Sequence, residues 1–162
     1  MSLPVFTAVH VLLGLVGIVA GTIAMAGLLR ASLLRGWTLL FLAMTLTTTV
    51  TGFLFPAPPF RLSHLLGLGM LALVALAVIA LAVKRLEGRW RTLYVVAAML
   101  TLYLQVGVLI AQIFKKVAPL AELEPTQGIW PLIAAEAVAL GAFGAATLLG
   151  VARFRPSPIH LA

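Results

Sequence analysis

Several ionisable and amide side chains of this sequence lie inside long apolar stretches. His10 and Glu136 interrupt the first and the last of these stretches, and Gln105 interrupts the fourth. A charged group at bilayer depth costs roughly 2.5–3.5 kcal/mol on insertion scales, so it needs a partner or a purpose. Imidazole groups ligate metals and haem, and they transfer protons near neutral pH. These residues are therefore the first candidates for function.

His10 and Glu136 are expected at the same depth in the membrane. His10 follows Leu3 by seven residues, and Glu136 follows Ile129 by seven. At a rise of roughly 1.5 Å per residue, each lies about 10 Å below the outer end of its helix. Glu136 is also the only acidic residue within an apolar stretch. We expect a hydrogen bond or ion pair between the two if their helices are neighbours.

A polar stripe follows the fourth apolar stretch at helical spacing, and lipid would reject that face. The stripe consists of Tyr94, Thr101, Gln105, Gln112 and Lys116. We predict an outward-facing polar pocket that binds a small molecule or a redox cofactor, or relays protons. A hydrogen-bond network that only fixes the order of the helices would use the same residue types. The candidate residues are His10, His64, Gln105, Gln112, Lys116 and Glu136.

The residues available limit the cofactor chemistry. His10 and His64 are candidate ligands of haem or a metal, although their expected depths differ by about 7 Å on the same rise. Together with Glu136 they could supply three zinc ligands, but no HExxH-type spacing is present. Cysteine and aspartate are absent, which excludes thiolate sites and a Ser-His-Asp set. Whether the chain is an enzyme stays open.

The apolar stretches that must position these residues predict an all-α membrane protein. Of the 162 residues 63% are apolar and 9% are charged, far from the composition of a soluble domain. Each stretch is long enough to cross a hydrocarbon core of roughly 30 Å. We predict one transmembrane domain over residues 1–162 with a bundle of five helices. The expected helices are 3–29, 36–56, 64–83, 92–114 and 129–152, with an outer loop at 117–128.

The basic residues predict the orientation of the bundle. Eight lie on one side, and three on the other: Arg61, Lys115 and Lys116. Short loops rich in Lys and Arg stay in the cytoplasm, so the N-terminus is expected outside and the C-terminus in the cytoplasm. The net charge of +7 therefore does not indicate nucleic-acid binding. The inner side is expected to carry topological charge and little else.

Small residues predict how the helices associate. Gly14, Gly17 and Gly21 form one stripe on the first helix, and such stripes allow close contact between helices in a membrane. The stripe fits packing within the chain, a homo-oligomer or another membrane-protein partner. An accessory or assembly subunit of a membrane complex is therefore an alternative function, and a small transporter is another.

Motifs spread over nearly the whole chain carry a resemblance. They are His10 with the glycines after it, Gly36-Trp37-Thr38, Thr51-Gly52-Phe53 leading to Pro56, Ser63-His64, Leu102-Tyr103-Leu104-Gln105, Gln112-Ile113-Phe114-Lys115-Lys116 and Leu123-Glu124-Pro125-Thr126-Gln127. The sequence resembles a widespread group of five-helix bacterial inner-membrane proteins, a group without an established activity. That group more usually has asparagine at the position of Gln105 and a residue other than lysine at Lys115.

This resemblance implies the bacterial inner membrane and an outer-face set of residues. The set is Gln112, Lys116, Pro125, Thr126 and Gln127. Thr126 and Gln127 lie in the loop beside the outer end of the polar stripe, where the loop either caps the pocket like a lid or is simply solvated.

Overall fold

The structure, a computed structural model, describes residues 2–56, 62–123 and 127–155. In these residues the chain contains six α-helices, a π-helical turn and no strand. Five helices are long and apolar enough to cross a membrane, as the sequence predicted. They are α1 (Leu3–Leu29), α2 (Arg35–Phe53), α3 (Leu62–Val78) with its π-helical continuation η1 (Ile79–Val83), α4 (Arg89–Lys116) and α7 (Trp130–Arg153).

The helix ends follow local sequence rules. α1 has the predicted bounds, with a proline in its first turn, where the missing N–H is not needed. α2 ends at Phe53, three residues before the predicted end. Pro56 explains the difference, because a proline disfavours the helical conformation of the residue before it. The predicted outer loop contains one short helix, α5 (Ala118–Ala121).

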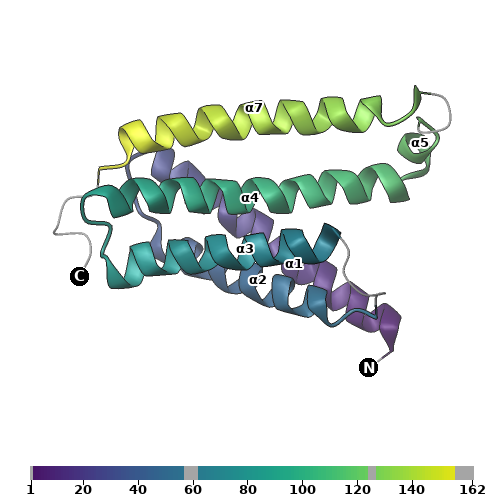
Figure 1. The fold of residues 1–162 in the computed structure, drawn as a ribbon, viewed down its shortest axis with the longest axis horizontal. Helices are drawn as coiled ribbons and strands as arrows, with labels where there is room; N and C mark the ends of the chain where they lie inside the picture. Colours follow the sequence, from purple (N-terminus) through teal and green to yellow (C-terminus); the bar gives the residue numbers. More distant parts are fainter. Residues whose placement is uncertain (1, 57–61, 124–126, 156–162) are drawn as a thin grey trace.

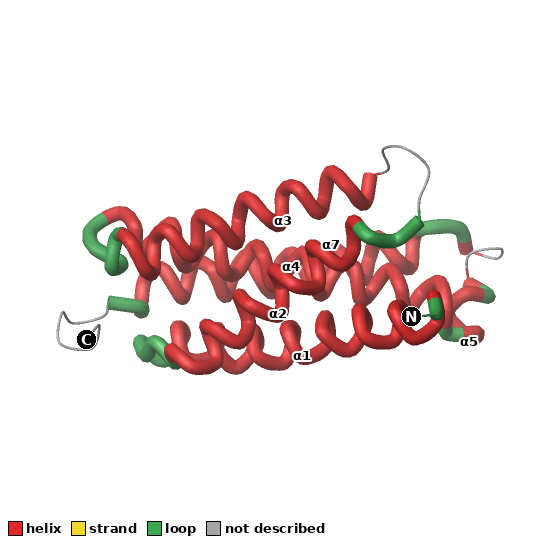
Figure 2. The backbone as a smooth tube through the Cα atoms, turned by 90° about the horizontal axis from the view of Figure 1, so that it is seen from below, coloured by secondary structure: helices red, strands yellow, loops and turns green. Residues whose placement is uncertain are grey.

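The helices form a four-helix group with a fifth helix on its side. The contact between α1 and α2 is the most extensive one in the bundle. α2 also packs against α3, α3 packs against α4, and α4 packs against α1. α7 packs on α4 and more lightly on α1 (Figures 1 and 2). In the described part of the chain, α3 and α7 make no contact with each other. α4 is therefore the central helix, with α3 and α7 on different sides of it.

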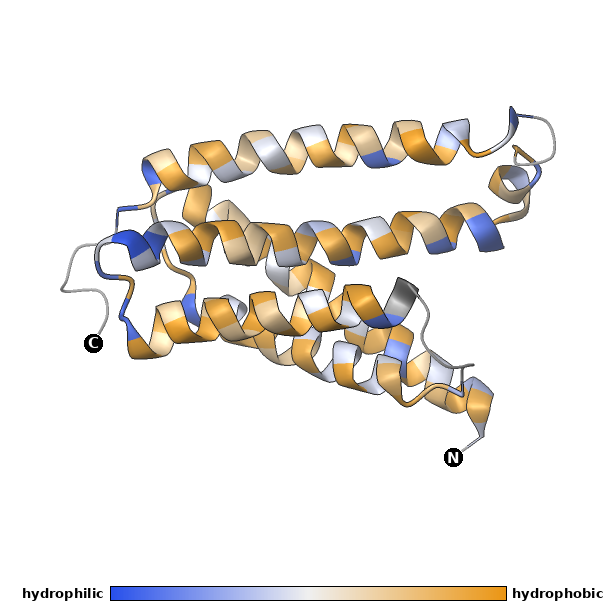
Figure 3. Cartoon of the chain, viewed as in Figure 1, coloured by the Kyte–Doolittle hydropathy of each residue, from blue (hydrophilic) through white to orange (hydrophobic). Residues whose placement is uncertain are grey.

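The start of α1 and the short helix α5 lie at one end of the bundle, and the end of α7 lies at the other (Figure 1). Apolar residues cover the lengths of the helices, and strongly hydrophilic residues gather mainly near the two ends (Figure 3). This distribution is that of a bundle that crosses a hydrocarbon layer, in which charged residues lie in the connections.

The glycine stripe of α1 packs inside the chain. Gly17 and Gly21 are buried. A Cβ atom at Gly21 would lie 2.7 Å from the Phe41 ring of α2 and 2.8 Å from Leu102 of α4. The absence of side chains thus lets three helices approach closely, as small residues do in membrane bundles.

The end of the bundle that the sequence predicts to be the inner one does more than carry charge, contrary to our expectation. Arg91 of α4 donates hydrogen bonds to the carbonyl oxygens of Val151, at 3.0 Å, and of Phe154. Basic side chains near a helix C-terminus satisfy its last carbonyls in this way. Phe154 is fully buried, and its ring centroid lies 6.4 Å from that of Tyr94. The hydrogen bonds of Arg91 and the buried ring of Phe154 therefore hold the C-terminal end of α7 against α4.

Candidate functional site

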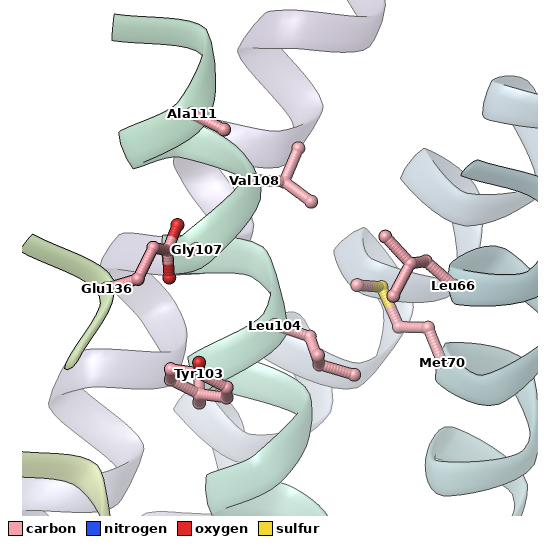
Figure 4. A pocket seen from close by; sticks show the side chains of 8 residues that line it. All are labelled: Leu66, Met70, Tyr103, Leu104, Gly107, Val108, Ala111 and Glu136. Atoms are coloured by element: carbon pink, nitrogen blue, oxygen red, sulfur yellow. The ribbon is translucent and has the colours of Figure 1, made fainter. Parts of the chain in front are cut away.

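A cavity lies between α3, α4 and α7, with a volume of about 210 Å³ (Figure 4). α3 supplies one wall, α4 supplies the floor, and α7 contributes a single residue, Glu136. Most of the lining is hydrophobic, as in most small-molecule sites. The lining residues are Leu66, Met70, Tyr103, Leu104, Gly107, Val108, Ala111 and Glu136.

The carboxyl group of Glu136 lies directly against Gly107 of α4. A Cβ atom at residue 107 would be 3.0 Å from Oε2 and 3.5 Å from Oε1 of Glu136. Figure 4 shows the two carboxyl oxygens beside the backbone of α4 at this point. The missing side chain of Gly107 therefore makes room for the carboxyl group. Within the described residues, no hydrogen bond or ion pair involves Glu136.

The cavity opens on the apolar outer surface of the bundle, which would face lipid in a membrane. Leu66 on one side is 39% exposed, and Val108 on the floor is 45% exposed. Tyr103 adds an aromatic ring to the lining, and its centroid lies 5.9 Å from that of Phe143 on α7. A guest could enter from the bilayer and reach both a carboxyl group and an aromatic ring.

His10 is paired with α2. Its Nδ1 atom lies 2.8 Å from the Thr51 hydroxyl, which donates its own proton to the Thr48 carbonyl oxygen at 3.0 Å. Because a hydroxyl has one proton, Nδ1–H of His10 is the donor in this contact. In the neutral form of the imidazole, the lone pair is then on Nε2. Phe55 packs edge-on against the ring, with centroids 5.1 Å apart. The expected pair with Glu136 is thus replaced by a pair with Thr51.

His64 lies near the N-terminal end of α3, where its ring centroid is 5.7 Å from that of Phe53. His10 and His64 thus contact two different phenylalanines near the end of α2, Phe55 and Phe53. The described residues contain no group of three or more His, Cys, Asp or Glu side chains that could hold a metal ion.

Gln105 of α4 is buried against α1, with only 6% of its surface exposed. A Cβ atom at Gly17 would lie 3.3 Å from its Nε2 atom. Among the described residues, both polar atoms of the amide lack a hydrogen-bond partner, as does the hydroxyl of Thr48. Three buried polar atoms without partners in one region are costly. This part of the predicted stripe faces the bundle interior, on a different side of α4 from the cavity.

The C-terminal part of the stripe is exposed. Tyr94 and Thr101 are buried, but Gln112 and Lys116 are exposed near the end of α4. Gln127 is also exposed. Thr126 lies outside the described residues. Of the predicted site residues, only Glu136 lines the described cavity, while His10 and Gln105 lie in the packing around α1.

The residues that the sequence analysis missed are the neighbours of Glu136, above all Gly107 and Tyr103. One signal could have found the first of them. Gly107 is the only glycine of the fourth apolar stretch, and it lies seven residues before the predicted end of that helix. It therefore has the same expected depth as Glu136. No family model matches the chain, and neither does any curated protein or solved structure.

Proposed function

We propose that this chain is a membrane protein that binds a small molecule in the cavity between α3, α4 and α7. The observation that carries the proposal is the carboxyl group of Glu136. It lies against Gly107 at an apolar cavity, and no described residue pairs with it. Acidic groups inside a membrane typically pair with one another or serve a function. A bound molecule that pairs with Glu136 would offset the unfavourable free energy of an unpaired carboxyl group inside the membrane.

The proposed setting is the bacterial inner membrane, with the cavity in the outer half. The excess of basic residues on the predicted inner side supports this orientation. Glu136 is six residues from the start of α7, so it lies about 9 Å below that end on a rise of roughly 1.5 Å per residue. The resemblance to five-helix bacterial inner-membrane proteins supports the choice of membrane.

Filling the cavity tests this function. Val108→Trp would place a large ring in the cavity from a position that already faces lipid. Val96→Trp is the matched control, because Val96 is 40% exposed on the same helix and does not line the cavity. Native mass spectrometry of protein released from micelles should show a small-molecule adduct on the wild type and on Val96→Trp, and none on Val108→Trp. An adduct that persists on Val108→Trp, or no adduct on any protein, contradicts the proposal.

A second candidate function, redox-cofactor binding, is favoured by the hydrogen bond of His10. Histidines that ligate metals commonly donate the other ring N–H to an oxygen, which fixes the tautomer. The bond from Nδ1 to Thr51 does this and leaves Nε2 as the ligand atom. Haem added to the purified protein should then give a Soret band that shifts on binding, and His10→Ala should abolish the shift. No shift in the wild type ends this candidate.

A further inference from the structure

We infer that the ligand of the cavity is a compact lipophilic cation, an amine or quaternary ammonium ion with an apolar body. This inference rests on the proposed function and adds the chemical class of the ligand. It combines three properties of the site: the charge of its one acidic group, the shape and chemistry of its lining, and the side from which it opens.

The charge of the ligand follows from Glu136. An ionised carboxylate is stable at membrane depth only beside a positive charge or strong hydrogen-bond donors. The basic residues of α4 lie at its two ends, and none of them forms an ion pair with Glu136. A cationic guest would supply the missing charge. An anionic guest would meet a carboxylate in a medium of low dielectric constant, where repulsion is strong.

The lining fits the apolar body of such a cation. Leu66, Met70, Leu104 and Val108 offer only hydrocarbon and thioether surface to a guest. The ring of Tyr103 adds a face that attracts a cation within roughly 6 Å of its centroid. The volume of about 210 Å³ lies below the roughly 300–1,000 Å³ of drug-sized pockets. The ligand is therefore small.

The exposure of the cavity indicates how the ligand arrives. Leu66 and Val108 both line the cavity and face lipid. α3 and α7 do not touch across it in the described part of the chain. A lipophilic cation that is already dissolved in the membrane can therefore enter sideways. A strongly hydrated ion such as ammonium lacks the apolar body that the lining is built to hold.

Benzyltrimethylammonium is a suitable probe, because it joins a quaternary ammonium ion to one aromatic ring. Neopentylbenzene has the same shape without the charge. The radiolabelled cation would be equilibrated by dialysis with the full chain in dodecyl maltoside, a detergent without charged groups. The wild type is compared with Glu136→Gln, which keeps the shape and removes the charge. Glu87→Gln is the matched control, because this exposed glutamate lies in the connection before α4.

The wild type and Glu87→Gln should bind the cation equally, and Glu136→Gln should bind it at least about tenfold more weakly. An excess of neopentylbenzene should not displace it. Val108→Trp, which keeps the carboxyl group, should also lose binding, so the result does not depend on how well Glu136→Gln folds.

Two outcomes overturn the inference in different ways. If Glu136→Gln binds the cation as tightly as the wild type does, or if neopentylbenzene displaces it, the cavity binds molecules without regard to charge. The proposed function then stands, and the cationic class is wrong. If the wild type does not bind the cation at all, the cationic class is again wrong. The adduct experiment with Val108→Trp then decides separately whether the cavity binds another small molecule.

Discussion

At the scale of single residues, two glycines make room for two polar side chains between the helices. Gly107 makes room for the carboxyl group of Glu136, and Gly17 makes room for the amide of Gln105. In both places a methyl group would come within 3.0 to 3.3 Å of a polar atom. The polar group and the glycine lie on different helices, so each pair depends on which helices are neighbours.

The sequence identified the polar residues that are unfavourable inside a membrane, but it did not identify which residues lie beside them. The depth of Glu136 could be read from its distance to the helix end, and the structure places it in that part of α7. The pairing of His10 with Thr51 could not be read, because several threonines of α2 are polar partners of similar depth. Which threonine faces His10 depends on how each helix is rotated about its axis, and hydropathy gives no information on this rotation.

The pair formed by His10 and Thr51 should contribute measurably to stability. Thr51→Val removes the hydroxyl with little change of shape, and His10→Ala removes the imidazole. A double-mutant cycle should give a coupling energy of about 0.5–1.5 kcal/mol, the usual net value of a hydrogen bond. Unfolding by SDS in mixed micelles measures it. Thr47→Val is the control partner, because Thr47 is exposed and bonds only to its own helix. Equal coupling in both cycles would contradict the assigned bond.

At the scale of the elements, hydropathy and proline positions predicted the helices well, because length and apolar content decide whether a segment spans a membrane. The ends were less accurate. α2 stops before Pro56, and α4 begins three residues earlier than predicted. The sequence also presented the glycine stripe of α1 as a surface for packing or self-association. In the structure α2 and α4 pack against it.

Two glycines of α1 should respond very differently to the same substitution. Gly21→Ala places a methyl group against Phe41 and Leu102, which are both almost fully buried and have little room to move. Such overpacking should lower the free energy of unfolding by about 1–3 kcal/mol.

Gly14→Ala is the control for this prediction. Its methyl group would meet only Thr48 Cγ2, at an ordinary distance of 3.5 Å. Because alanine favours a helix over glycine, this variant should be as stable as the wild type or more stable by up to about 1 kcal/mol. SDS unfolding compares the two. Equal losses for both variants would mean that Gly21 is not at the close contact described.

At the scale of the whole molecule, five helices that each cross a membrane would place the two chain ends on opposite sides of it. The start of α1 and the end of α7 do lie at opposite ends of the bundle (Figure 1). The single helix α7 extends the four-helix group and is held by Arg91 and Phe154 at its C-terminal end. Its other end, with Glu136, borders the cavity. One end of α7 is thus held against α4, and the part near its other end borders a cavity that opens on the apolar outer surface of the bundle.

The orientation can be checked with reporters at the C-terminus. Eight basic residues flank the spans on the predicted inner side, so the C-terminus should lie in the cytoplasm. In bacterial cells a green fluorescent protein fused there should fluoresce, and alkaline phosphatase should be inactive. The reverse pattern would place the cavity in the inner half of the membrane.

The central claim is that Glu136 presents an unpaired carboxyl group to a cavity that lipid-soluble molecules can enter. Dicyclohexylcarbodiimide, an apolar reagent that modifies carboxyl groups inside membranes, tests it most directly. Intact-mass and peptide analysis after treatment in lipid vesicles should show a single adduct on Glu136. The adduct should be absent in Glu136→Gln and strongly reduced in Val108→Trp, while Val96→Trp reacts like the wild type. An unmodified Glu136 in the wild type, or equal labelling of Val108→Trp, would contradict the claim.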